Sequence, residues 1–189
     1  KNVVASNVGA AFAVHAGDID NDGDIDIVAG IGSGVPVKVE LYKNDGAANP
    51  SFSSTNVSTA DGIFVIRDVY IADIDSDGDS DIVSAEGNST VAWHENDGAS
   101  NPSWTRNIVT SSSAYEKTDI HVADMDGDGD LDLLSLSQDE NTVSWYENDG
   151  GVNPSFVEVD IANTVEGAYE LFTGDLDGDG DLDIVSASY

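Results

Sequence analysis

Short stretches of alternating apolar and polar residues follow one another along the chain and return at regular intervals. In the second unit, residues 64–72 (FVIRDVYIA) precede an acidic loop and residues 82–85 (IVSA) follow it. Residues 142–147 (TVSWYE) and 156–159 (FVEV) illustrate the two further stretches of a unit. Alternation over about four to eight residues, bounded by Gly, Asn and Asp, is typical of β-strands. The pattern therefore predicts four short antiparallel strands per unit and no amphipathic helix.

Two motifs mark each unit. The acidic loop has the sequences DIDNDGDID, DIDSDGDSD, DMDGDGDLD and DLDGDGDLD, which begin at residues 18, 73, 124 and 175 and are spaced by 55, 51 and 51 residues. An aromatic motif, such as WYENDGGVNPSF at 145–156, follows the first three loops at a spacing of 52 residues. A repeat of about this length with four strands and an aromatic signature is typical of a β-propeller blade.

The repeats predict an all-β chain of four-stranded antiparallel propeller blades, about 3.5 to 4 of them in a single repeat domain. The expected units are a partial blade at 1–10, blades at 11–60, 61–113 and 114–164, and a partial blade at 165–189. With an additional strand near residues 2–6, this amounts to about 15 strands, whereas four complete blades need about 16. We therefore expect the ends to be completed by flanking repeats or by neighbouring copies; the alternative is a compact four-bladed ring.

Charge excludes several kinds of partner. The 189 residues include 37 acidic and 6 basic side chains, a formal net charge of −31. Binding to nucleic acid or to an anionic membrane surface requires Lys and Arg, so neither is expected. Hydrophobic residues make up 40% of the chain, which indicates a folded domain, and no apolar run approaches the about 20 residues of a membrane span. Without cysteine, disulfides and thiolate metal sites are excluded.

The acidic loops have the donor spacing of a calcium site. Two carboxylates about 5 Å apart repel by about 3 kcal/mol at an effective dielectric of about 20, so a cation is expected among them. Aspartates at loop positions 1, 3, 5 and 9, a glycine at 6 and a backbone carbonyl at 7 supply hard oxygen donors, which Ca²⁺ prefers. An EF-hand would need a glutamate at position 12, where this chain has Ala29, Ser84, Ser135 and Ser186. The remaining alternative is a solvated acidic turn without an ion.

Together, the DxDxDGDxD loop after a strand and the aromatic NDG motif resemble the FG-GAP/VCBS-type repeats of extracellular β-propellers. They are distantly similar to the calcium-binding blades of integrin α-subunits. The resemblance implies four Ca²⁺ ions, with side-chain ligands Asp18, Asp20, Asp22, Asp26, Asp73, Asp75, Asp77, Asp81, Asp124, Asp126, Asp128, Asp132, Asp175, Asp177, Asp179 and Asp183. Mainly backbone carbonyls are expected from Asp24, Asp79, Asp130 and Asp181. Neither Phe-Gly nor Gly-Ala-Pro occurs in the chain, so no integrin-like ligand site is implied.

Aromatic residues recur at fixed repeat positions. Trp93, Trp145, Tyr42 and Tyr146 lie in the aromatic motifs, where we expect them to pack blade against blade. The alternative is a platform on which glycans stack. His94 occupies the same repeat position as the two tyrosines, which favours a packing role for it.

The other two histidines also replace aromatic residues. His15 and His121 share a position, three residues before the loop, with Tyr70 and Phe172. A packing role is therefore favoured over that of a general base. With no nucleophile or phosphate-binding motif in the chain, we expect no enzyme activity, and replacement of the histidines by Phe or Tyr should leave ligand binding intact.

Acidic residues also recur five positions before the loops. Asp68, Asp119 and Glu170 coincide there, with Ala13 at the same place in the first repeat. If the first strand of each blade is innermost, these side chains lie near the central channel. The alternative is that they pair with loop or backbone donors.

These observations predict a non-catalytic, calcium-binding propeller module. The resemblance further implies an extracellular location, either secreted or at the cell surface, and a role in adhesion or recognition of a glycan or an extracellular protein. Two alternatives remain open. One is an accessory or catalytic propeller of a secreted polysaccharide-degrading enzyme, and the other is a self-assembling component of a surface fibre.

Overall fold

The computed structural model describes residues 3–6, 9–32, 36–59, 64–111 and 117–188, and in these ranges every regular element is a strand. The first sheet consists of β1 (Ala10–Gly17), β2 (Asp26–Gly32), β3 (Lys38–Asn44) and β4 (Phe52–Thr59). The second consists of β5 (Ile66–Ala72), β6 (Asp81–Glu86), β7 (Thr90–Asn96) and β8 (Trp104–Ser111). The third consists of β9 (Lys117–Ala123), β10 (Asp132–Ser137), β11 (Thr142–Asn148) and β12 (Phe156–Ala162). The last contains β13 (Ala168–Gly174) and β14 (Asp183–Ser188).

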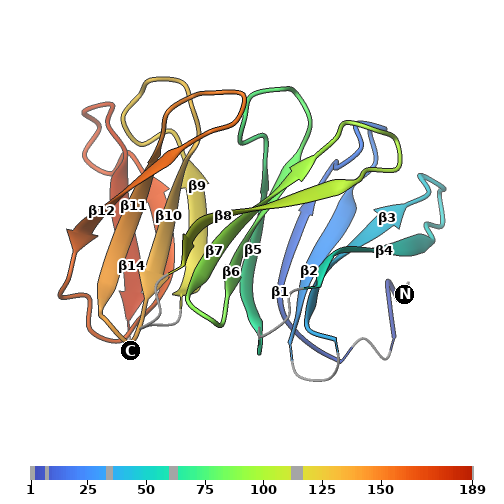
Figure 1. Cartoon of the computed structure of the whole chain (residues 1–189), viewed down its shortest axis with the longest axis horizontal. Coiled ribbons are helices and arrows are strands. Elements are labelled where there is room, and N and C mark those ends of the chain that lie inside the picture. The colour runs from blue at the N-terminus through green and yellow to red at the C-terminus, as the bar shows by residue number, and fades with distance from the viewer. Residues whose placement is uncertain (1–2, 7–8, 33–35, 60–63, 112–116, 189) are drawn as a thin grey trace.

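Each sheet is an antiparallel meander, as the repeat pattern predicts. Strands pair in chain order, β1-β2-β3-β4 in the first sheet and in the same way in the others. The four sheets lie in a row, with the two ends of the chain at opposite ends of that row (Figure 1). One expectation is wrong: residues 3–6 are not a strand. Residue 2 of that expected strand lies outside the described residues.

The core lies between neighbouring sheets. Val28 and Leu41 of the first sheet share a cluster with Ile66, Val69 and Ile82 of the second, and all five side chains are buried. Equivalent clusters join the second sheet to the third and the third to the fourth. Since burying one such side chain contributes about 1.5 to 3 kcal/mol, these clusters hold the row of blades together.

The motif aromatics fill these interfaces, with one exception. Trp93 and Tyr146 are buried in the cluster between the second and third sheets, and Trp145 packs against the next cluster. Tyr42 does not lie between blades. It is buried beside Val4 and Ala5, because it faces the side of the first sheet that no other described sheet covers.

The first strands of the blades are neighbours. A column of rings runs across them, from His15 to Tyr70, His121 and Phe172, with centroids 4.4, 5.5 and 5.3 Å apart. His94 is fully buried, and its Nε2 lies 2.9 Å from Ser84 Oγ. Burial lowers the pKa of His94 to about 3, which keeps the ring neutral. His15 and His121 are half-buried and line a cavity, so their ring contacts agree with a packing role, while the absence of a general base stays a prediction.

Candidate metal sites

The acidic loops lie at one end of the sheets. Each connects the first two strands of a blade, and because alternate connections of a meander meet at the same end, the turns β3–β4, β7–β8 and β11–β12 lie beside them (Figure 1). The two sequence motifs of a unit are therefore in contact. This placement decides which side chains surround each loop.

The backbone of each loop curls around its first aspartate. In the first loop, Asp18 Oδ1 accepts the N–H of Asp22 at 3.1 Å, and its Oδ2 accepts the N–H of Gly23 at 2.9 Å. Gly23 has φ of 90° and Asn21 has φ of 56°, so the loop turns twice through the left-handed region. Position 6 is glycine in all four loops, and glycine adopts this conformation without strain.

Three carboxylates converge in every loop. Their ligand atoms lie within 4.8 Å of one another, and the groups are Asp18, Asp20 and Asp22; Asp73, Asp75 and Asp81; Asp124, Asp126 and Asp128; and Asp175, Asp177 and Asp183. Calcium–oxygen distances are about 2.3 to 2.6 Å, so donors around one ion lie up to about 5 Å apart. The donor set and its spacing therefore fit Ca²⁺, and these carboxylates are the residues that would hold the ion.

The ninth aspartate of each loop also braces the backbone. Asp81 Oδ2 accepts the N–H of Ile74 at 3.1 Å, and its Oδ1 accepts the N–H of Asn96 at 2.8 Å. Asp26 and Asp132 make the same pair of contacts and lie outside the carboxylate groups of their loops. In the first three blades the ninth aspartate thus links the loop to the NDG turn of its own blade, and in the fourth loop Asp183 accepts the N–H of Leu176.

Of the other predicted ligands, six lie outside the converging groups. Two are the fifth-position residues Asp77 and Asp179, and four are the seventh-position residues Asp24, Asp79, Asp130 and Asp181. In the first three loops the seventh-position carboxylate packs closely against the glycine of the NDG turn. Asp24, Asp79 and Asp130 lie so near to this glycine that any side chain in its place would clash with them.

Burial acts against the negative charge in the loops. It raises the pKa of Asp81 to about 7, although the backbone N–H groups of Asn96 and Ile74 act in the opposite direction. Burial also raises the pKa of Asp75, and the carboxylates of Asp77, Asp73 and Glu95 add to the effect. A cation between these groups would favour their ionised forms.

Asparagines of the NDG motif join successive blades. Asn96 Nδ2 donates to Ser80 O of its own blade at 2.9 Å and to Ile19 O of the preceding acidic loop at 3.2 Å. Asn148 repeats the arrangement with Leu131 O and Ile74 O, both at 3.0 Å. The sequence marked this motif only as a turn; its recurrence after each of the first three acidic loops was the signal that the two interact.

The recurrent carboxylates before the loops bind backbone donors. Asp68 Oδ2 accepts the N–H of Ile120 at 3.1 Å, and Asp119 Oδ2 accepts the N–H of Leu171 at 2.6 Å. Each carboxylate thus binds a backbone N–H group in the middle of the first strand of the following blade. Both carboxylates also line a cavity of about 310 Å³ together with His15, His121 and Glu170.

Comparison with known families identifies the repeats. The FG-GAP-like repeat matches residues 18–84, 73–135 and 124–186, each match running from one acidic loop through the next. The chain belongs to this family. FG-GAP repeats are typical of extracellular proteins and generally non-catalytic. A search of curated proteins finds no match. No helix among the described residues is long and apolar enough to cross a membrane.

Proposed function

We propose that the FG-GAP chain is a non-catalytic, extracellular propeller module that binds four Ca²⁺ ions, one in each acidic loop. The observation that carries this proposal is the convergence of three aspartates in every loop on a shared point, with ligand atoms within 4.8 Å. Oxygen donors without His or Cys favour Ca²⁺ over softer metals. Extracellular modules bind Ca²⁺ at about 10⁻⁴ to 10⁻³ M, a range that suits calcium-rich surroundings.

The ions would be structural. In each of the first three units the loop is hydrogen-bonded to the NDG turn through its ninth aspartate, and in two of them the turn reaches the preceding blade. An ion that neutralises the loop would therefore also support contacts between blades. A ligand that binds only the folded state stabilises it by mass action.

The biological role proposed for the module is adhesion or recognition, with a glycan or an extracellular protein as partner. Support comes from the repeat family, whose repeats are typical of extracellular proteins and generally non-catalytic. Flanking repeats or neighbouring copies would complete the row of blades. A glycan array probed with and without Ca²⁺ tests the role; turnover of a polysaccharide by the chain would contradict it.

Thermal unfolding tests the calcium proposal. The chelator-treated protein should melt at a lower temperature than the protein in millimolar Ca²⁺, and Mg²⁺ should restore less of the loss, because it demands stricter octahedral geometry. Asp73→Ala and Asp124→Ala should each reduce the shift, since each removes a carboxylate that both binds the loop backbone and faces the ion. The same melting temperature in Ca²⁺ and in chelator would contradict the proposal.

A further inference from the structure

The first acidic loop faces a lysine where the next two units have glutamates. Lys43 in LYKNDG occupies the position of Glu95 in WHENDG and Glu147 in WYENDG. Its Nζ contacts the carboxylate of Asp20 and lies 3.8 Å from Asp22 Oδ2. A positive charge is therefore already present among the carboxylates of this loop.

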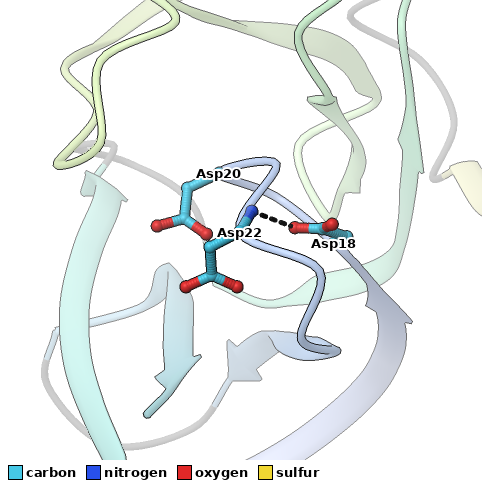
Figure 2. A group of neighbouring side chains, drawn as sticks. All are labelled: Asp18, Asp20 and Asp22. Atoms are coloured by element: carbon cyan, nitrogen blue, oxygen red, sulfur yellow. Dashed lines mark hydrogen bonds between the residues drawn. The ribbon is translucent and has the colours of Figure 1, made fainter. Parts of the chain in front are cut away.

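The partner of Lys43 is buried. The side chain of Asp20 is only 2% exposed, and apart from this ion pair neither of its oxygens accepts a hydrogen bond from a described residue. In Figure 2 the carboxylates of Asp20 and Asp22 lie side by side, across the loop from Asp18. A buried carboxylate without a partner is costly, so the ammonium group compensates the charge that an ion would otherwise neutralise.

Lys43 also reaches the next blade. Its Nζ donates to Ser100 O at 3.2 Å, in the turn between β7 and β8. The ammonium group thus bridges the first loop and the second sheet. Any ion that displaces it from Asp20 must also disturb this bridge.

The second loop provides the contrast within the same chain. Asp75 is the counterpart of Asp20 and is likewise buried, but the position of Lys43 is occupied there by Glu95, which carries the opposite charge. The loop sequences DIDNDGDID and DIDSDGDSD keep all five aspartates in register. The two loops thus share their aspartates in sequence, and they differ in the sign of the charge at the position of Lys43 and in which third carboxylate converges.

We infer that Lys43 is a built-in counter-cation that makes the first loop a weaker calcium site than the second and third. The inference rests on the calcium function proposed above. Calcium entering the first loop has to displace or repel an ammonium group, whereas in the second loop it meets an additional carboxylate. Without calcium, the first loop keeps its shape better than the others because Lys43 stands in for the ion.

A calcium titration followed by NMR resolves the loops individually. The position-6 amides of Gly23, Gly78 and Gly129 donate to the first aspartate of their loops and report on each site. The first loop should bind Ca²⁺ on the order of tenfold or more weakly than the other two. Lys43→Met should narrow the difference because it removes the ammonium group, and Lys43→Glu should remove the rest because it makes this position the same in all three units.

Two further variants complete the design. Glu95→Lys should weaken the second loop by a similar factor and leave the third unchanged. Lys38→Met is the matched control, because Lys38 lies at the other end of β3 and pairs with Glu40 at 2.7 Å; it should leave the affinity of the first loop unchanged. Equal affinities in all three loops of the unaltered chain, unchanged in Lys43→Met and Glu95→Lys, would overturn the inference and leave the calcium function standing. Absence of calcium binding in every loop would overturn both.

Discussion

Arg106 neutralises a buried carboxylate inside the second blade. Its Nε and Nη2 donate to the two oxygens of Glu86 at 3.1 and 2.6 Å, and the Glu86 side chain is 1% exposed. Burial raises the pKa of Glu86, and Arg106 opposes that rise. Removing Arg106 alone should therefore destabilise the fold more than replacing both Arg106 and Glu86 by apolar residues.

Arg106→Met should lower the free energy of unfolding by about 3 kcal/mol, because it leaves the Glu86 carboxylate buried without its cation. The double variant Arg106→Met/Glu86→Met should recover most of that loss. Denaturant unfolding in saturating calcium measures both. A double variant no more stable than the single one would show that the lost stability comes from packing.

At the scale of elements, the NDG asparagines determine how one blade meets the preceding one. Asn96→Ala should lower the free energy of unfolding by about 1 to 3 kcal/mol, since two carbonyls, Ser80 O and Ile19 O, lose their donor. Asn44→Ala is the matched control, because the only carbonyl that Asn44 Nδ2 contacts among the described residues is Ile25 O of its own loop, in an exposed setting. Chemical denaturation of the two variants side by side checks this; equal losses would contradict the bridging role.

The first strands carry a pH-sensitive pair. Asp68 and Asp119 share a side-chain hydrogen bond, and His15, His121 and Glu170 are the other ionisable groups near them. The pKa of Asp119 is raised from an ordinary value of 3.8 to about 8. Burial is the largest cause, and the hydrogen bond to Asp68 is the next. The folded protein therefore holds a proton that the unfolded chain releases. The stability from this proton is fully present below about pH 4 and is lost as the pH rises through about 8.

Asp119→Asn should remove this loss, because the amide oxygen can still accept the N–H of Leu171 and the amide nitrogen can donate to Asp68. The free energy of unfolding of the unaltered chain should fall relative to the variant between pH 4 and pH 9. Glu170→Gln, at the same repeat position in the last sheet, serves as the comparison and should reduce the slope only slightly, because Glu170 is the last of the causes that raise the pKa of Asp119. Parallel stability curves for the Asp119→Asn variant and the unaltered chain would refute the shared proton.

At the scale of the whole molecule, the repeat length and the alternation of side chains were sufficient to predict four-stranded antiparallel blades, because each unit carries the same turn residues and aromatics. The repeat pattern could not predict what Tyr42 packs against. Among the described residues no sheet covers the outer face of the first sheet, so Tyr42 contacts Val4 and Ala5 there and not a neighbouring blade. The spacing of aspartates predicted the loops but not which carboxylates converge. The fifth-position aspartate belongs to the group in the first and third loops and the ninth-position aspartate in the second and fourth, although the spacing is the same in all four. The role of Lys43 requires the fold, which brings β3 beside the loop.

Calcium should act on all blades at once. When free Ca²⁺ is twenty times the dissociation constant of a site, that site adds about 1.8 kcal/mol, so the second, third and fourth loops together add about 5 kcal/mol. This is comparable to the whole stability of an ordinary domain, so chelation should unfold or loosen the row of blades. Circular dichroism and scattering in calcium and in chelator measure the effect; an identical profile in both would contradict a structural role.

Counting the bound ions tests the central claim most directly. Equilibrium dialysis of the chelator-treated chain against increasing Ca²⁺, with the metal measured on both sides of the membrane, gives the number and affinity of the sites. We predict four Ca²⁺ ions per chain at saturation, with millimolar Mg²⁺ unable to displace them. Binding of no calcium at millimolar concentration, or a saturating number unrelated to the four loops, would contradict the account.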